Sequence, residues 1–79
     1  MSWTEQSNRL TKSFKQNSFD EIILNLVMLA KVADEKQHHP DFKVENYNEI
    51  TFTLWTHDAG GITDKDHDLA KEIDQLFTS

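Results

Sequence analysis

The segment Ile50-Thr51-Phe52-Thr53-Leu54-Trp55-Thr56-His57 gives the strongest secondary-structure signal in this 79-residue chain. Apolar and polar side chains alternate along it, which is typical of a β-strand with one buried face. We predict that the apolar residues face the core and that His57 ends the strand on the opposite face. The expected buried set is Ile50, Phe52 and Leu54.

Two segments on either side of this strand show helical spacing. The first begins after Ser18, whose hydroxyl is expected to accept a hydrogen bond from the backbone N–H of Glu21. Pro40 stops this helix, which places His38 near its last turn. The second helix begins after Thr63. The expected buried stripes are Phe19, Ile22, Ile23, Leu26, Ala30 and Ala33 in the first helix, and Leu69, Ala70, Ile73, Leu76 and Phe77 in the second.

Two hairpins complete the predicted architecture. Residues 3–15 alternate loosely in polarity around Ser and Asn turn formers, and residues 42–47 form a short strand that turns back into residues 50–57. Two hairpins and two helices indicate the α+β class, here an antiparallel four-stranded sheet with two helices packed on one face. For a chain of this length we expect a single domain over residues 1–79.

Charge and composition exclude several classes of protein. Eight basic and fourteen acidic residues give a net charge of −6, and the lysines are scattered, so we expect no direct binding to nucleic acid. No segment approaches the roughly 20 apolar residues of a membrane span. The sequence therefore predicts a cytoplasmic protein without membrane attachment.

The first helix carries more apolar surface than one sheet can cover. Leu24, Met28 and Val32 form a second stripe at four-residue spacing. We interpret this stripe as a subunit interface and expect a homodimer or homotetramer, because a chain of this length has a small core. The alternative is that these three side chains are simply tolerated on an exposed surface.

Three of the four histidines lie where predicted elements end. His38 and His39 precede Pro40 at the end of the first helix, and His57 ends the strand. Imidazoles titrate near neutral pH, so one can act as an acid and another as a base. The cluster therefore favours proton-transfer chemistry, and the alternative is a polar helix end followed by a proline stop.

The acidic residues near these histidines have more than one interpretation. Asp66 stands at the position of a capping box after Thr63 and can cap the second helix whatever else it does. A metal site would combine Asp66 or Asp58 with the histidines, but no His-x-x-x-His spacing is present, so we expect no metal. His67 lies among acidic residues and is expected to be solvated.

A longer motif links these residues. It reads Asp34-x-x-x-His38-His39-Pro40, then Tyr47-Asn48, then Thr56-His57-Asp58-Ala59-Gly60-Gly61-Ile62-Thr63-x-x-Asp66-x-x-Leu69-Ala70. This pattern resembles the pterin-4a-carbinolamine dehydratases, also called 4a-hydroxytetrahydrobiopterin dehydratases, and the likeness extends back to about Trp3. The chain departs from the family pattern at Trp55, where a small residue is usual.

The resemblance implies a hydro-lyase that dehydrates 4a-hydroxytetrahydrobiopterin to quinonoid dihydropterin, in the recycling of the tetrahydropterin cofactor of aromatic amino acid hydroxylases. It implies that the catalytic residues are His38, His39, His57 and Asp66, and that the loop Asp58-Ala59-Gly60-Gly61 contacts the pterin. No metal or organic cofactor is expected. The alternative is a non-catalytic interaction module, a dimerisation cofactor of a transcription factor, which would work in the nucleus.

Overall fold

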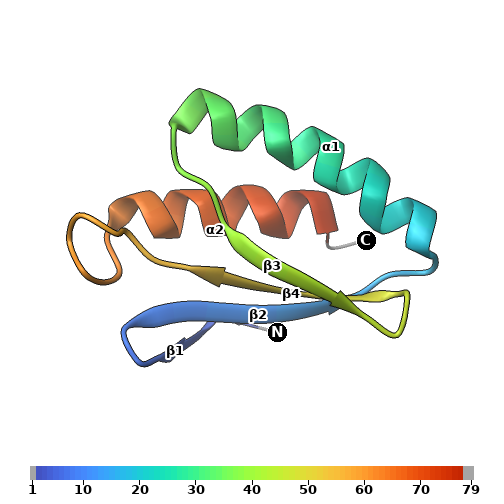
Figure 1. Ribbon diagram of the computed structural model, residues 1–79, viewed down its shortest axis with the longest axis horizontal. Helices are drawn as coiled ribbons and strands as arrows, with labels where there is room; N and C mark the ends of the chain where they lie inside the picture. Colours follow the sequence, from blue (N-terminus) through green and yellow to red (C-terminus); the bar gives the residue numbers. More distant parts are fainter. Residues whose placement is uncertain (1, 78–79) are drawn as a thin grey trace.

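The computed structural model describes residues 2–77 and confirms the predicted fold class (Figure 1). Four strands form one antiparallel sheet in the order β1-β2-β4-β3, and both helices lie on the same side of it. The elements are β1 (Thr4–Gln6), β2 (Arg9–Lys15), α1 (Phe19–Lys36), β3 (Asp41–Glu45), β4 (Glu49–Leu54) and α2 (Asp64–Phe77).

Both predicted hairpins form, and each turns through two residues in the left-handed region. Ser7 and Asn8 have φ values of 51° and 64°, and Asn46 and Tyr47 have 52° and 57°. In the β1–β2 turn these two residues join the paired Gln6 and Arg9, as in a type I′ turn, whose twist matches that of the strands it joins. The β3–β4 turn has one residue more, Asn48, before the paired Glu49. These turns fix the register of β1 on β2 and of β3 on β4, whereas β2 and β4 meet through tertiary packing, with Leu10 paired to Leu54.

The core lies between the sheet and the helices. Phe14, Phe52 and Phe77 form an aromatic cluster in which the rings of Phe52 and Phe77 are 5.0 Å apart. Around it lie the other buried apolar residues: Leu10, Ile22, Leu29, Ala33, Ile50, Leu54, Leu69, Ala70 and Ile73. The buried stripe predicted for α2 is confirmed, with Leu76 partly buried against it.

The buried face of α1 differs from the predicted one. Ile22 and Ala33 are buried, but Leu29 is buried with them, whereas Phe19, Ile23 and Ala30 are exposed. The covered stripe follows the spacing i, i+4, i+7, i+11 and is narrower than the apolar surface of the helix. Periodicity could not select it because apolar residues occur around most of the circumference. The covered residues are Ile22, Leu26, Leu29 and Ala33.

Of two predicted boundaries, one was wrong. Helix α1 ends at Lys36 because Gln37 takes a left-handed conformation, and His38 follows this cap directly, near the last turn as expected. Strand β4 ends at Leu54 rather than at His57. Its pairing with β2 stops at the Leu10–Leu54 pair, and a strand cannot continue without a neighbour to accept its hydrogen bonds.

Part of α1 remains uncovered in the single chain. Leu24 is 66 % exposed and Val27 and Met28 are each 54 % exposed, while Val32 is half-buried. Neither helix in residues 2–77 combines the length and apolar character that a membrane crossing needs.

Candidate active site

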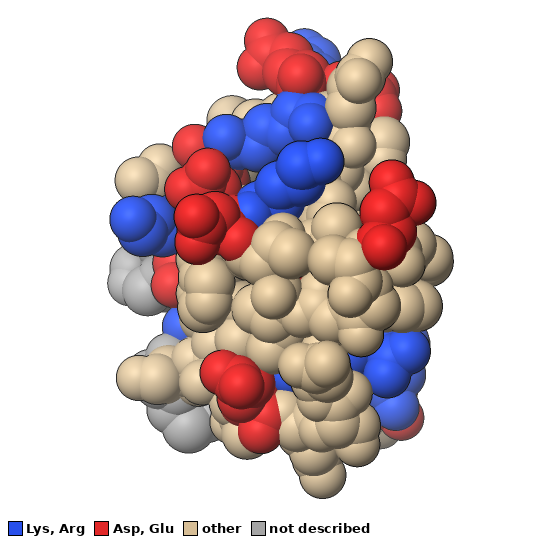
Figure 2. Space-filling view, turned by 90° about the vertical axis from the view of Figure 1, so that its left-hand side faces the viewer, with Lys and Arg blue, Asp and Glu red and all other residues tan. Residues whose placement is uncertain are grey.

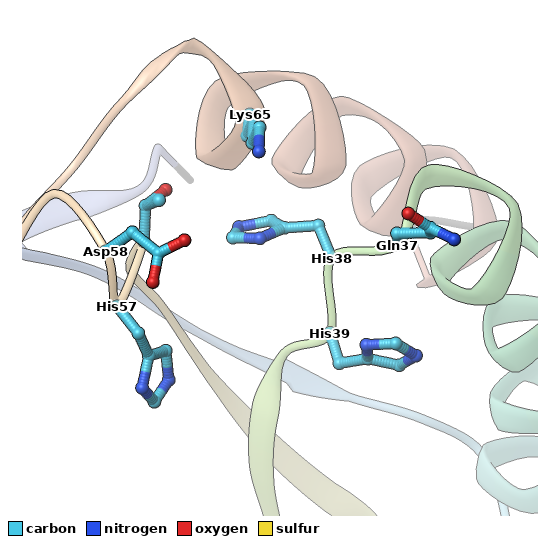
Figure 3. Close-up of a pocket in the computed structure, with 7 residues that line it drawn as sticks. Gln37, His38, His39, His57, Asp58 and Lys65 are labelled. Atoms are coloured by element: carbon cyan, nitrogen blue, oxygen red, sulfur yellow. The ribbon is translucent and has the colours of Figure 1, made fainter.

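The histidines gather at the end of the molecule where α1 and β4 finish and α2 begins, on the left of Figure 1. A cavity of about 270 Å³ lies there. This volume is slightly below the roughly 300–1,000 Å³ of typical ligand pockets, and it suits a small ring system. Seven residues line the cavity: Gln37, His38, His39, Thr56, His57, Asp58 and Lys65 (Figure 3).

His38 is placed by the way α1 ends. Gln37 adopts φ 53° and ψ 40°, and the backbone N–H of His38 then bonds to the carbonyl of Ala33 at 3.1 Å. This bond satisfies one of the free carbonyls of the last turn and directs the chain toward α2. The His38 side chain is 11 % exposed, and its Nε2 lies 2.5 Å from Oδ1 of Asp66.

Asp66 lies behind His38, outside the cavity lining, with its side chain fully buried. Its Oδ2 accepts hydrogen bonds from the Thr63 backbone N–H at 2.9 Å and from the Thr56 hydroxyl at 2.8 Å. The bond from Thr63 is one half of the predicted capping box. In the other half the Thr63 hydroxyl would accept from the Asp66 backbone, but here it lies 2.7 Å from the Thr56 hydroxyl. Asp66 thus caps α2 and orients His38.

The contacts of Asp66 set its charge. Burial by itself raises the pKa of the Asp66 carboxyl, but the bonds to His38, Thr63 and Thr56 outweigh burial and lower the pKa below its ordinary value of 3.8. An ionised carboxylate can only accept, so Nε2 of His38 carries a hydrogen whether the ring is neutral or charged. Nδ1 is therefore the ring atom of His38 that gains or loses a proton.

His57 and Asp58 lie on the loop that follows β4. Thr56 pairs with Gly61, with the Thr56 N–H bonded to the Gly61 carbonyl at 2.9 Å, and this pair closes the loop between them. In Figure 3 the Asp58 carboxylate and the His38 ring point toward each other, while the ring of the neighbouring His57 points away from both. Two imidazoles from different parts of the fold thus border one cavity.

His39 contributes differently. Its Nε2 lies 2.8 Å from Oδ1 of Asp34, and both side chains are largely exposed. Figure 3 shows the ring turned away from His38 and His57. His39 also lines a second, apolar cavity of about 230 Å³ with Pro40 and Phe42. All three histidines therefore border the first cavity, and His39 differs from the others in its exposed partner Asp34 and in lining the second cavity as well.

The rest of the predicted substrate loop supports the cavity from outside. Ala59, Gly60 and Gly61 do not line it. Gly60 has φ 69°, a conformation that glycine takes without strain. Gly61 is buried against the side chain of Asn8, where a Cβ atom would lie 2.5 Å from Nδ2 of that asparagine. These residues let the loop turn tightly and pack on the β1–β2 turn.

Sequence reasoning assigned no role to three of the lining residues. Thr56 lies inside the quoted motif, so its hydroxyl could have been considered. Gln37 and Lys65 gave no signal in the sequence. Gln37 reaches the cavity because of its left-handed backbone, and Lys65 because of the orientation of α2. Lys65 also lines an adjoining hollow with Lys36. Figure 2 faces this end of the molecule and shows basic side chains gathered above a largely uncharged surface, with acidic ones beside them.

Metal binding finds no support in the geometry of residues 2–77. No three histidine or acidic side chains in this part of the chain are arranged to hold a metal ion. The polar groups around the cavity include an imidazole backed by a carboxylate, further imidazoles and a lysine, which are group types that can exchange protons.

Comparison with known proteins adds to this geometry. The family model described as Pterin 4 alpha carbinolamine dehydratase matches residues 1–76. The chain belongs to the pterin 4 alpha carbinolamine dehydratase family. A member from Roseiflexus sp. (strain RS-1), named "Putative pterin-4-alpha-carbinolamine dehydratase", is 43 % identical over 75 residues, which are 95 % of this chain and 80 % of the relative. A protein of the same name from Sulfurisphaera tokodaii is 43 % identical over 96 % of this chain and 81 % of its own length.

Solved structures of this family and its relatives share the fold. A Brucella melitensis protein described as a transcriptional coactivator/pterin dehydratase superposes with a TM-score of 0.89 at 27 % identity, over 96 % of this chain and 82 % of its own. A pterin dehydratase-like protein described as a RuBisCO assembly factor in the α-carboxysome gives 0.83 at 24 % identity, over 100 % and 93 % of the two chains. Proteins described by different roles therefore share this architecture.

Proposed function

We propose that this protein is a 4a-hydroxytetrahydrobiopterin dehydratase. The observation that carries the proposal is the His38–Asp66 pair, which lies at the wall of a cavity that His57 also lines. Membership of the family supplies the substrate class, a 4a-hydroxytetrahydropterin. The physiological role that follows is cytoplasmic recycling of the tetrahydropterin cofactor of aromatic amino acid hydroxylases.

The reaction needs one proton removed and one delivered. The N5 proton of the pterin goes to a base, the C4a–O bond breaks as the 4a-hydroxyl is protonated and leaves as water, and a double bond forms between N5 and C4a. In our proposal His38, through Nδ1, and His57 exchange these two protons. Asp66 stabilises the His38 imidazolium, Asp58 and Lys65 orient the polar edge of the pterin, and His39 bounds the substrate position. Residues 59–61 act indirectly, by shaping the loop that carries His57 and Asp58.

The decisive experiment is a dehydration assay with chemically generated 4a-hydroxytetrahydropterin, in the presence of a chelator. We expect the wild type to accelerate dehydration, and His38→Gln and His57→Gln each to lower turnover by about 10²–10⁴-fold, the usual contribution of a positioned acid or base. His67→Gln is the matched control, because His67 is exposed and lines neither cavity. A wild type without activity, or activity that requires added metal, would contradict the proposal.

We further propose that the protein self-associates as a dimer or tetramer through α1. The exposed side chains Leu24, Val27 and Met28 form an apolar surface on a chain whose own core is small. Replacing Leu24 and Met28 together by Glu would place unpaired charges in such an interface and should yield smaller species by light scattering. Lys71→Glu, at an exposed position on α2, controls for the added negative charge. A monomeric wild type at micromolar concentration would refute this assembly.

A second function, as an interaction module for a transcription factor, is favoured by the same α1 surface and by the coactivator description of the Brucella melitensis protein. The two functions make different demands on the chain. Catalysis depends on His38 and His57, whereas a module depends on the α1 surface alone. A wild type that fails the dehydration assay but forms hetero-oligomers lost in the Leu24→Glu/Met28→Glu variant would favour the module.

A further inference from the structure

The three histidines of the site are held in different ways. His38 is bonded to Asp66 and His39 to Asp34. The side chain of His57 is exposed, and neither of its ring nitrogens has a hydrogen-bond partner among residues 2–77. Instead, the His57 ring stacks on the indole of Trp55, with 4.0 Å between ring centroids and 26° between ring planes.

The stack follows from the strand that precedes it. Trp55 and His57 are two residues apart, so an extended backbone directs both to the same face of the sheet, away from the helices. The Thr56–Gly61 pairing keeps that backbone extended after β4 has ended. His57 therefore meets the indole although both residues lie beyond the last paired residue of the strand.

Arg9 supports the indole from the neighbouring strand. Leu10 of β2 pairs with Leu54 of β4. Arg9 and Trp55 are the next residues along these antiparallel strands, so they lie opposite each other on the same outer face. The guanidinium carbon of Arg9 is 4.1 Å from the centroid of the Trp55 ring, within the range of a cation–π contact. The buried Nε1 of Trp55 has no hydrogen-bond partner in the described part of the chain. The indole is thus held through its faces rather than through its N–H.

We propose that Trp55, braced by Arg9, is a positioning residue that fixes the His57 imidazole at the cavity. The proposal rests on the dehydratase function, in which His57 exchanges a proton with the pterin. An exposed histidine on a loop can populate several χ1 rotamers, and a stacked neighbour favours one of them. Trp55 acts through His57 and does not itself line the cavity.

The stack can be tested without any substrate. We expect the carbon-bound ring protons of His57 to show upfield NMR shifts from the indole ring current, assigned with His57→Gln. Trp55→Leu keeps an apolar side chain but removes the flat ring, so these shifts should vanish. Trp55→Phe should retain a smaller upfield shift. Thr53→Ala, on the same face of β4, is the matched control and should leave the His57 signals unchanged. Identical His57 signals in the wild type and Trp55→Leu would overturn the stack.

The kinetic test asks whether the stack matters for turnover. Aromatic pairs contribute enough to change a rotamer population by about three- to tenfold, so we expect kcat of Trp55→Leu to fall by that factor with little change in KM. Trp55→Phe should restore most of the loss, and Arg9→Gln, which leaves the core untouched, should show a smaller fall. An active wild type with unchanged kcat in Trp55→Leu and Arg9→Gln would refute the positioning role. An inactive wild type would instead refute the proposed function, and the NMR shifts would still show whether His57 stacks on Trp55.

Discussion

Replacing Asp66 by asparagine changes one atom of the buried network and tests its two roles together. The Thr63 backbone N–H cannot rotate, so the single oxygen of the new amide must stay opposite it, where it can also accept from Thr56. The amide nitrogen then faces Nε2 of His38, at the position now held by Oδ1. Since that nitrogen only donates, neutral His38 must accept at Nε2 and move its hydrogen to Nδ1.

The magnitudes follow from the type of each bond. Hydrogen bonds to a charged group contribute about 1.5–3 kcal/mol and neutral ones about 0.5–1.5 kcal/mol, so three weakened bonds, offset by the easier burial of a neutral amide, predict a loss of roughly 1–2 kcal/mol. Turnover should fall by about 10- to 100-fold, because the exchangeable position of His38 is filled and the imidazolium loses its counter-charge.

Three measurements separate the roles of Asp66. Urea denaturation gives the free energy of unfolding, the dehydration assay gives turnover, and ¹⁵N NMR reports which nitrogen of His38 carries hydrogen. Asp74→Asn is the matched control, because Asp74 also lies on α2 and pairs with Lys12, but far from the cavity. A stability loss with wild-type turnover would leave Asp66 as a helix cap only. If neutral His38 of the Asp66→Asn variant kept its hydrogen on Nε2, the predicted move of that hydrogen to Nδ1 would be refuted.

Three further predictions concern the fold. The pKa of the Asp66 carboxyl is lowered in the folded protein, so its contribution to stability is complete above pH 3.8 and is lost as the pH falls through the folded-state pKa. We expect the free energy of unfolding, measured against pH, to show this loss in the wild type but not in Asp66→Asn. Leu29→Ala should cost about 2–5 kcal/mol in urea denaturation at low protein concentration, whereas Ile23→Ala should cost about 0.5 kcal/mol or less, and equal losses would contradict the observed face of α1. Gly61→Ala should lower the stability measured by thermal unfolding by only about 1 kcal/mol, because the obstructing Asn8 side chain can move away and gives up one hydrogen bond. A decrease in stability several times larger would mean that the backbone has to shift.

Local signals predicted most of the architecture. The turn formers at Ser7-Asn8 and Asn46-Tyr47, the Ser18 cap and the alternation in β4 depend on neighbouring residues only, and each leads to the expected element. Boundaries and faces were less predictable. The alternation continues through Trp55 and His57 although β2 no longer offers a partner there, and α1 is apolar on more sides than it buries.

The sequence by itself determined the kinds of chemical group in the site and the family to which they belong. The motif placed His38, His39, His57 and Asp66 together as a set, because their identity and order are visible along the chain. It could not distinguish a histidine with a buried carboxylate from one with an exposed partner, since His38 and His39 are adjacent in sequence.

Tertiary structure decided which groups each histidine contacts. The left-handed Gln37 directs His38 toward α2, where Asp66 is already fixed by the cap of that helix, and leaves His39 beside Asp34 on the outside. The pairing of Leu10 with Leu54 brings Arg9 next to Trp55, and the indole then holds His57. These contacts join residues from different elements, so they exist only once the sheet and helices have packed, and no local pattern could encode them.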